Sequence, residues 1–217
     1  MIAIVDYGMG NLASVEKACR FLGHRAVVTS DPKQVARAKK LILPGVGAFG
    51  EAMRELRSRK LVAPILDSIG EEKPFLGLCL GLQLLFESSE ESAGVRGLGV
   101  LSGRVRRFPR KRDLKVPHMG WNQIRSSPRK RGSDSRFREN DILAGIPDGA
   151  FMYFVHSYFA DPEEESVVAA RTEYGGRFPS VVWDGGSIWA TQFHPEKSQK
   201  WGLKILGNFL SIQETRC

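Results

Sequence analysis

Short apolar runs alternate with amphipathic segments through the first half of the chain, and this alternation constrains the fold more than any other feature of the sequence. Continuous apolar runs are typical of parallel strands buried on both faces, whereas an apolar stripe with helical spacing is typical of a covering helix. The pattern predicts strands over residues 2–5, 25–29, 40–43 and 75–78, and helices over residues 11–22, 48–58, 61–69 and 80 to about 88. We therefore expect an α/β fold whose mostly parallel, twisted sheet has helices on both faces.

The second half of the chain has a different pattern, in which apolar runs follow one another with turns between them. Strands are predicted over residues 100–108, 151–159, 167–171, 181–183 and 187–192, with a last amphipathic helix over residues 200–212. Because tight turns join antiparallel neighbours, some of these strands are expected to form an antiparallel edge of the sheet. A chain of 217 residues is long enough for a substantial core, so residues 1–217 are expected to form a single domain.

Basic residues are concentrated in one block of an otherwise mildly acidic chain. The net charge is +8, but residues 104–138 contain thirteen Lys and Arg against two Asp, a charge of +11, which leaves −3 for the remainder. Within this block, residues 126–140 are rich in Ser, Arg and Gly and lack helical or strand periodicity, so they are predicted to be a disordered basic insertion. A nucleic-acid-binding arm is the alternative, but only Phe137 is interleaved with the charges, so nucleic acid is not expected as a partner.

The sequence contains no segment typical of a membrane span or a signal peptide. Its longest apolar stretch, residues 75–86, is interrupted by Gln83 and is too short to cross a bilayer. We expect a soluble, cytoplasmic protein without a membrane partner. The three cysteines, Cys19, Cys79 and Cys217, form no Cys-x-x-Cys motif, and neither metal-ligand spacing nor a Walker-type nucleotide loop is present, so no metal and no cofactor are predicted.

Cys79 lies at the centre of the strongest local motif, Gly-Leu-Cys-Leu-Gly at residues 77–81. An apolar strand precedes it and a helix is predicted after it, which is the arrangement of a nucleophile elbow with cysteine in place of serine. The flanking glycines are needed because a sharp strand-to-helix turn crowds neighbouring side chains. N–H groups at the start of the helix favour the thiolate form of a cysteine placed there. The alternative is a core cysteine in a glycine-rich strand end.

A thiolate nucleophile needs a base and a group that orients the base. His194 is the best candidate because it lies in Gln-Phe-His-Pro-Glu, residues 192–196, just after a predicted strand. Residues two apart in an extended segment point the same way, so Glu196 is placed to contact the imidazole and to fix its tautomer. The other three histidines are expected to be structural or surface residues: His24, His118 and His156.

The turn Pro-Gly-Val-Gly at residues 44–47 ends the third predicted strand. The carboxyl ends of parallel strands line the ligand crevice of an open α/β sheet, so this turn is expected to face Cys79. Its glycines allow backbone N–H groups to point inward, and the predicted oxyanion-hole donors are Val46, Gly47 and Leu80. A plain strand-ending turn is the alternative.

Together these motifs resemble the class-I, triad-type glutamine amidotransferases, and more narrowly the glutaminase subunits of imidazole glycerol phosphate synthase. The resemblance covers nearly the whole chain. The cysteine elbow and His-Pro-Glu are common to the wider class. The narrower match rests on Asp-Tyr-Gly-x-Gly-Asn at residues 6–11, Pro-Gly-Val-Gly at residues 44–47 and Gly-Trp-Asn at residues 120–122. The main departure is the segment 126–140, which begins a few residues after Trp121 and leaves the triad positions unchanged.

The resemblance implies a flavodoxin-like α/β fold in which Cys79, His194 and Glu196 hydrolyse glutamine to glutamate and ammonia. The implied partner is a (β/α)₈-barrel cyclase subunit that forms a heterodimer with this chain and uses the ammonia to make imidazole glycerol phosphate in histidine biosynthesis. The residues that would hold glutamine are Gly45, Gln83, Ser157 and Tyr158, and those that would lie near the partner are Asn11, Trp121 and Asn122.

Three other functions remain open from the sequence. The chain is also compatible with a glutaminase subunit of another amidotransferase, such as pyridoxal phosphate synthase, although the motifs at residues 6–11 and 44–47 speak against it. A cysteine peptidase or hydrolase on a related sheet is the second, and a panel of peptide substrates would test it. A nucleic-acid-binding module is the third, and it predicts salt-dependent binding that is lost when residues 126–140 are deleted.

Overall fold

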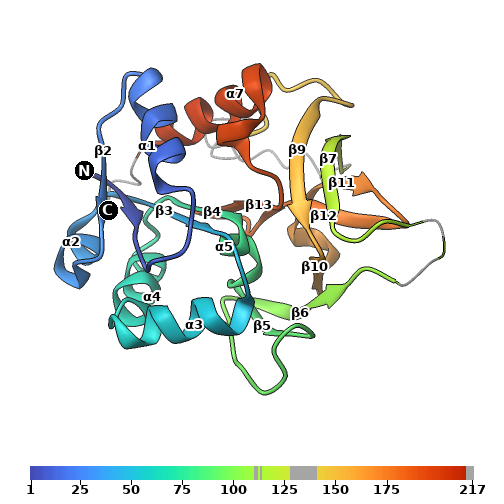
Figure 1. The fold of residues 1–217 in the computed structure, drawn as a ribbon. Helices are drawn as coiled ribbons and strands as arrows, with labels where there is room; N and C mark the ends of the chain where they lie inside the picture. The colour runs from blue at the N-terminus through green and yellow to red at the C-terminus, as the bar shows by residue number, and fades with distance from the viewer. Residues whose placement is uncertain (110–111, 113, 128–140, 214–217) are drawn as a thin grey trace.

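The computed structural model of the chain describes residues 1–109, 112, 114–127 and 141–213. At its centre is an eight-stranded sheet with the strand order β2-β1-β3-β4-β13-β12-β11-β8 (Figure 1). The five strands from β2 to β13 run parallel, and the last three are antiparallel to their neighbours, so the predicted α/β fold with an antiparallel edge is confirmed. The strands are β1 (Ile2–Val5), β2 (Ala26–Thr29), β3 (Lys40–Gly45), β4 (Phe75–Cys79), β8 (Arg125–Ser126), β11 (Val168–Glu173), β12 (Arg177–Trp183) and β13 (Ile188–Thr191).

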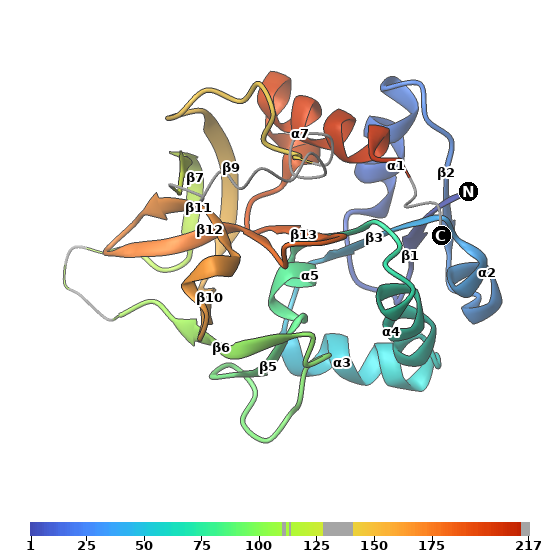
Figure 2. The same ribbon diagram turned by 180° about the vertical axis from the view of Figure 1, so that it is seen from behind.

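Helices cover both faces of this sheet. The helices α1 (Leu12–Phe21) and α7 (Gln199–Ser211) lie on one face, and α3 (Phe49–Ser58) and α4 (Val62–Gly70) lie on the other (Figures 1 and 2). Among the described helices, none is long and apolar enough to span a membrane.

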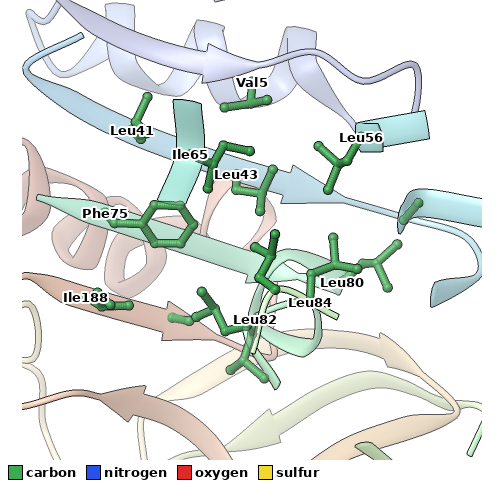
Figure 3. Close-up of a cluster of buried hydrophobic side chains, with 14 of the residues drawn as sticks. Val5, Leu41, Leu43, Leu56, Ile65, Phe75, Leu80, Leu82, Leu84 and Ile188 are labelled. Atoms are coloured by element: carbon green, nitrogen blue, oxygen red, sulfur yellow. The ribbon is translucent and has the colours of Figure 1, made fainter. Parts of the chain in front are cut away.

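Successive residues of the parallel strands contribute to two separate cores. Val5 and Leu43 pack in the core on the α3–α4 side, whereas Ile4 and Ile42 pack in the core on the α1–α7 side. This follows from the two-residue period of a strand, which sends neighbouring side chains to opposite faces. Figure 3 shows the first of these cores, where side chains of β1, β3 and β4 meet those of α3 and α4. The continuous apolar runs of the sequence are thus buried on both sides.

Two smaller sheets extend the antiparallel half of the molecule. One has the order β10-β6-β5, and the other pairs β7 with β9. Their strands are β5 (Phe86–Ser89), β6 (Leu101–Arg107), β7 (His118–Gln123), β9 (Phe151–His156) and β10 (Tyr158–Pro162). The single strand predicted over residues 151–159 is therefore wrong. β9 pairs with β7, whereas β10 pairs with β6. The change of partner occurs at Ser157, whose carbonyl accepts a hydrogen bond from the N–H of Phe108.

The helix predicted from residue 80 to about residue 88 is also wrong beyond its first turn. The helix α5 spans only Leu80–Gln83, and β5 follows it. The carbonyls of Leu84 and Leu85 accept hydrogen bonds from residues 98–101 instead of continuing the helical ladder. Leu84 and Leu85 are fully buried, so neither can lie on a solvent-exposed helix face. Tertiary pairing has therefore overridden the local helical pattern.

Two further differences concern short elements. The helix α2 (Pro32–Arg37) was not predicted, although Asp31 caps it by accepting a hydrogen bond from the N–H of Lys33 and Pro32 occupies its first position. The strand β8 places Ser126 in the sheet edge beside β11, so the predicted insertion at residues 126–140 begins too early. Its remaining part, residues 128–140, lies outside the described residues.

Candidate active site

Cys79 is the last residue of β4 and lies at a sharp turn into α5. Its backbone has φ 54° and ψ −103°, a left-handed conformation that costs a non-glycine residue free energy. The two flanking glycines are required by close contacts. A Cβ on Gly77 would lie 2.8 Å from the carbonyl oxygen of Gly81, and a Cβ on Gly81 would lie 1.8 Å from that of Leu43. The structure thus has the strained elbow that the motif predicts.

His194 follows β13 and is oriented by Glu196 of the 3₁₀ turn Pro195–Lys197. The imidazole Nδ1 and the Glu196 Oε1 lie 2.9 Å apart, and both side chains are buried. The backbone carbonyl of His194 accepts a hydrogen bond from the Ser198 hydroxyl, and its N–H donates to the Tyr153 carbonyl. Among the described residues, the Nε2 of His194 has no hydrogen-bond partner. Because Glu196 engages Nδ1, the second ring nitrogen is left free for the reacting groups.

The protonation of His194 is set by its two charged neighbours. Burial lowers the pKa of the imidazole, but the charge and proximity of Cys79, together with the hydrogen bond and charge of Glu196, outweigh burial and raise it to about 10. An imidazolium at this position can give a proton to a leaving group, which is the second task of the base in a triad.

His118 and His156 form a separate buried pair. The His118 Nδ1 lies 3.0 Å from the His156 Nε2, and the rings pack among Phe108, Phe154 and Phe178. Burial lowers the pKa of His118 to about 4 and that of His156 to about 3. Both rings are therefore neutral at physiological pH, in agreement with the expected structural role.

The turn at residues 44–47 lies beside the elbow. Gly45 is the sheet neighbour of Cys79, and the Tyr7 hydroxyl donates a hydrogen bond of 2.9 Å to the Pro44 carbonyl. A Cβ on Gly45 would lie 2.2 Å from that hydroxyl, so only glycine fits. Val46 is 40% exposed and Gly47 has φ +97°, and Leu80 begins α5 directly after Cys79. The arrangement brings the predicted donor segments to the same strand ends, and their oxyanion role stays a prediction.

The predicted glutamine-binding residues divide into two groups. Gln83 is buried one helical turn after Cys79, and its Nε2 donates to the Tyr158 carbonyl and to the Gln192 Oε1. Ser157 lies at the switch between β9 and β10, next to Tyr158, and both are half-buried. Gln83 thus links the helix after the elbow to the start of β10, whereas Gly45 is the neighbour of Cys79 on the parallel side.

Of the predicted partner-binding residues, Trp121 and Asn122 are neighbours on β7, whereas Asn11 precedes α1, which packs against α7 and the 3₁₀ turn Pro195–Lys197. Trp121 is 46% exposed, and Met119, two residues earlier on β7, is 60% exposed. Asn122 instead contacts the interior, because its side-chain amide lies 3.2 Å from the His118 Nε2 and donates to the Glu173 carbonyl.

Sequence reasoning assigned no role to two residues that contact the site, Tyr7 and Gln192. Gln192 is fully buried, and its Nε2 lies 3.7 Å from the Cys79 Sγ. The two-residue period of an extended segment, which linked Glu196 to His194, also places Gln192 on the side of His194. Tyr7 has no comparable signal, because its contact with Pro44 depends on the packing of β1 against β3.

Among the described residues, no group of three His, Cys, Asp or Glu side chains is arranged to hold a metal ion. Cys19 and Cys79 are both unpaired and buried. Cys217 lies outside the described residues.

Comparison with known proteins places this geometry in a family. The family described as glutamine amidotransferase class-I matches residues 3–212. The imidazole glycerol phosphate synthase HisH subunits of Geobacter metallireducens and Rhodopirellula baltica are 53% and 51% identical to this chain over 213 and 209 residues, which are 96% of this chain and 96% of each relative. Two solved structures share the fold of this chain at lower sequence identity. One is a glutamine amidotransferase with a TM-score of 0.73 and 20% identity, and the match covers 98% of both chains. The other is a glutamine amidotransferase from Thermotoga maritima with a TM-score of 0.63 and 17% identity over 96% of this chain and 95% of that chain. The chain therefore belongs to the class-I glutamine amidotransferase family, within the group of imidazole glycerol phosphate synthase HisH subunits.

Proposed function

We propose that this chain hydrolyses glutamine to glutamate and ammonia and delivers the ammonia to a cyclase subunit that makes imidazole glycerol phosphate. The observation that carries the proposal is the buried His194–Glu196 pair beside a strained Cys79 elbow, in a chain about half identical to HisH subunits over nearly its full length. Pyridoxal phosphate synthase is the rival destination for the ammonia, and the names of these relatives favour the histidine pathway.

The reaction follows the roles of a cysteine triad. The Cys79 thiolate attacks the side-chain amide carbon of glutamine, and N–H groups of Val46, Gly47 and Leu80 stabilise the oxyanion. One such donor contributes about 10²- to 10³-fold in rate. The His194 imidazolium then protonates the departing ammonia, which leaves a glutamyl thioester on Cys79. Water that has given a proton to His194 attacks the thioester, and glutamate leaves as the thiolate forms again.

The proposed contacts of glutamine are Gly45, Gln83, Ser157 and Tyr158, of which Gly45 pairs with Cys79 in the sheet and Gln83 bonds the Tyr158 carbonyl. Gln83 has one amide oxygen beyond the two hydrogen bonds of its nitrogen. That oxygen can accept from the α-amino group of the substrate.

The partner is proposed to dock on the outer face of the β7–β9 sheet. Met119, Trp121 and Phe151 are all large, apolar and at least 46% exposed there. A hollow of about 390 Å³, lined by Trp121, Phe151 and Trp201, adjoins this face. Clustered aromatic residues beside a pocket are typical of the central anchors of protein interfaces. Asn11 is a second proposed contact, near the start of α1.

Glutamate release from glutamine tests the proposal, measured with and without a barrel cyclase subunit that carries its nucleotide ligand. A large rise on addition of the cyclase is expected, because ammonia lost to bulk water is wasted and coupling to an occupied partner prevents this loss. The Cys79→Ala variant should lose glutamine-dependent synthesis and keep synthesis from free ammonia in the complex. Loss of both activities would contradict the assignment. The cytoplasmic location remains a prediction from the sequence.

A further inference from the structure

Within the part of the chain that the structure describes, two polar groups besides the base lie close to the Cys79 sulfur. The Gln192 Nε2 lies 3.7 Å from the Sγ, and the Val155 carbonyl oxygen lies 3.9 Å from it. A thiol can donate to a carbonyl, whereas a thiolate can only accept. The sulfur therefore has one partner suited to each of its protonation states, and Gln192 is the one suited to the thiolate.

The orientation of the Gln192 amide follows from the Tyr158 carbonyl, through the side chain of Gln83. The Tyr158 carbonyl can only accept hydrogen bonds, so the Gln83 atom 2.9 Å from it must be the Nε2. That same Nε2 lies 3.2 Å from the nearest side-chain atom of Gln192, which must then be the Oε1. The remaining amide atom of Gln192, its NH₂ group, is consequently the one that faces the sulfur.

The Tyr158 carbonyl is held from its other side by the buried histidine pair. The His156 Nδ1 lies 2.8 Å from it and must donate. Because His156 is neutral, its Nε2 accepts from the His118 Nδ1, and the His118 Nε2 in turn accepts from the Asn122 amide. The hydrogen bonds run in one direction from Asn122 to the carbonyl, so the carbonyl and the amides that depend on it are held in a single arrangement.

We propose that Gln192 is a further catalytic residue, whose amide N–H donates a hydrogen bond to the Cys79 thiolate and stabilises it before attack on the substrate. The inference rests on the nucleophilic role proposed above for Cys79. The bond is strongest while the sulfur is negative and weakens when the thioester forms, so it stabilises the reactive state of the enzyme. Gln83 is a positioning residue in this scheme, because it sets which atom of Gln192 meets the sulfur.

The rate of Cys79 alkylation by iodoacetamide, measured against pH without glutamine, tests this role. In Gln192→Met, which keeps the size of the side chain and removes the N–H, labelling near neutral pH should be about tenfold slower, and the midpoint of its pH profile should rise by about one unit. Thr191→Val is the matched control. Thr191 directly precedes Gln192 and is equally buried, and its hydroxyl bonds the Phe193 carbonyl rather than the sulfur, so this variant should label as the unaltered chain does. Cys79→Ala gives the background from other cysteines.

A profile of Gln192→Met with an unchanged midpoint would overturn the proposal, as would an equal shift in Thr191→Val. A second measurement needs no variant at position 192. The side-chain amide resonance of Gln192 in the unaltered chain should move with pH in step with the alkylation profile and should lose this dependence in Cys79→Ala. An amide signal that ignores Cys79 would also overturn it. Both measurements omit glutamine, so their outcome does not depend on glutamate release. A protein that released no glutamate would contradict the proposed function, whereas only the alkylation profile and the amide resonance decide the role of Gln192.

Discussion

The nucleophile and its base follow neighbouring strands, β4 and β13, at the border between the parallel and antiparallel halves of the sheet, and they are positioned by different means. On the parallel side, Cys79 is placed by the backbone, through a left-handed φ and a glycine at position 81 that presses on β3. Toward the antiparallel side, His194 is held by two hydrogen bonds: its Nδ1 donates to the Glu196 carboxylate, and its carbonyl accepts from the Ser198 hydroxyl. This region also holds the neutral His118–His156 pair.

The contrast implies two kinds of sensitivity. Backbone contacts are insensitive to pH but tolerate no added atom, because packed interiors have no room for even one methyl group. Buried hydrogen bonds tolerate changes of shape but depend on protonation and on each partner being present. Substitutions on the two sides should therefore affect different measurements.

The largest expected effect is on the base side, in Glu196→Gln. The amide keeps the shape of the carboxylate but removes its charge and permits the wrong imidazole tautomer, so kcat should fall about 10³- to 10⁴-fold. Thermal unfolding should move far less than kcat. Glutamate release by the complex gives the rate, and ammonia-dependent synthesis is the control that should stay constant. An equal loss in both assays would show that the residue supports the fold instead.

The second effect is on the nucleophile side, in Gly81→Ala. The added Cβ would lie 1.8 Å from the Leu43 carbonyl oxygen, so α5, which carries Gly81, must move away from β3, and the free energy of unfolding should fall by more than about 3 kcal/mol. Gly70→Ala is the matched control, since nothing lies within 4 Å of its Cβ position. Urea denaturation of both variants measures the difference. Similar midpoints would mean that the elbow yields to substitution as easily as a helix end.

The third effect is a pH dependence of the free energy of unfolding, which comes from the buried histidine pair of the antiparallel half. The folded pKa values of His118 and His156, about 4 and about 3, lie below the ordinary value of 6.5, so both rings favour folding only while neutral. Their contribution is complete above pH 6.5 and is lost as the pH falls toward 4, by about 1.4 kcal/mol per histidine per pH unit. Urea denaturation between pH 7 and pH 4 measures the slope. His118→Phe should have a shallower slope, and an unchanged slope would count against this origin.

The smallest effect concerns the contact between the first strand and the turn at residues 44–47. In Tyr7→Phe the Pro44 carbonyl loses its donor, which should cost about 1 kcal/mol of stability. If Val46 and Gly47 supply oxyanion donors, kcat should also fall while KM stays nearly constant, because the turn matters most in the transition state. Steady-state kinetics with saturating cyclase would measure both, and an unchanged kcat would separate the turn from catalysis.

The sequence predicted the parallel half well because local patterns there coincide with the tertiary environment. Residues 2–5 are continuously apolar because their strand is covered on both faces, so the local pattern directly reports the burial. The elbow and the His-Pro-Glu motif were recognisable since their geometry depends on residues close in sequence. The proximity of Cys79 to His194 rests on the pairing of β4 with β13, which parallel-sheet topology makes plausible but local pattern does not specify.

The antiparallel half was predicted less well because its structure depends on distant partners. Leu84 and Leu85 follow a helical pattern, yet their carbonyls bond to residues 98–101. The switch at Ser157 leaves no periodic signal, since both flanking strands are extended. The relay through His118, His156 and Gln83 joins segments up to 75 residues apart, and no spacing rule connects them.

The Tyr158 carbonyl, on which that relay converges, is a backbone atom that every amino acid carries. Replacing the Tyr158 side chain leaves this oxygen in place, so a mutational scan of position 158 reports on the ring and passes over the acceptor. A sequence alignment cannot detect this acceptor either, because every amino acid at position 158 provides the same backbone carbonyl. Only a change of the main chain itself, such as an ester in place of the amide that follows Tyr158, would weaken this acceptor. One acceptor of this site is therefore provided by the path of the main chain and not by the identity of a side chain.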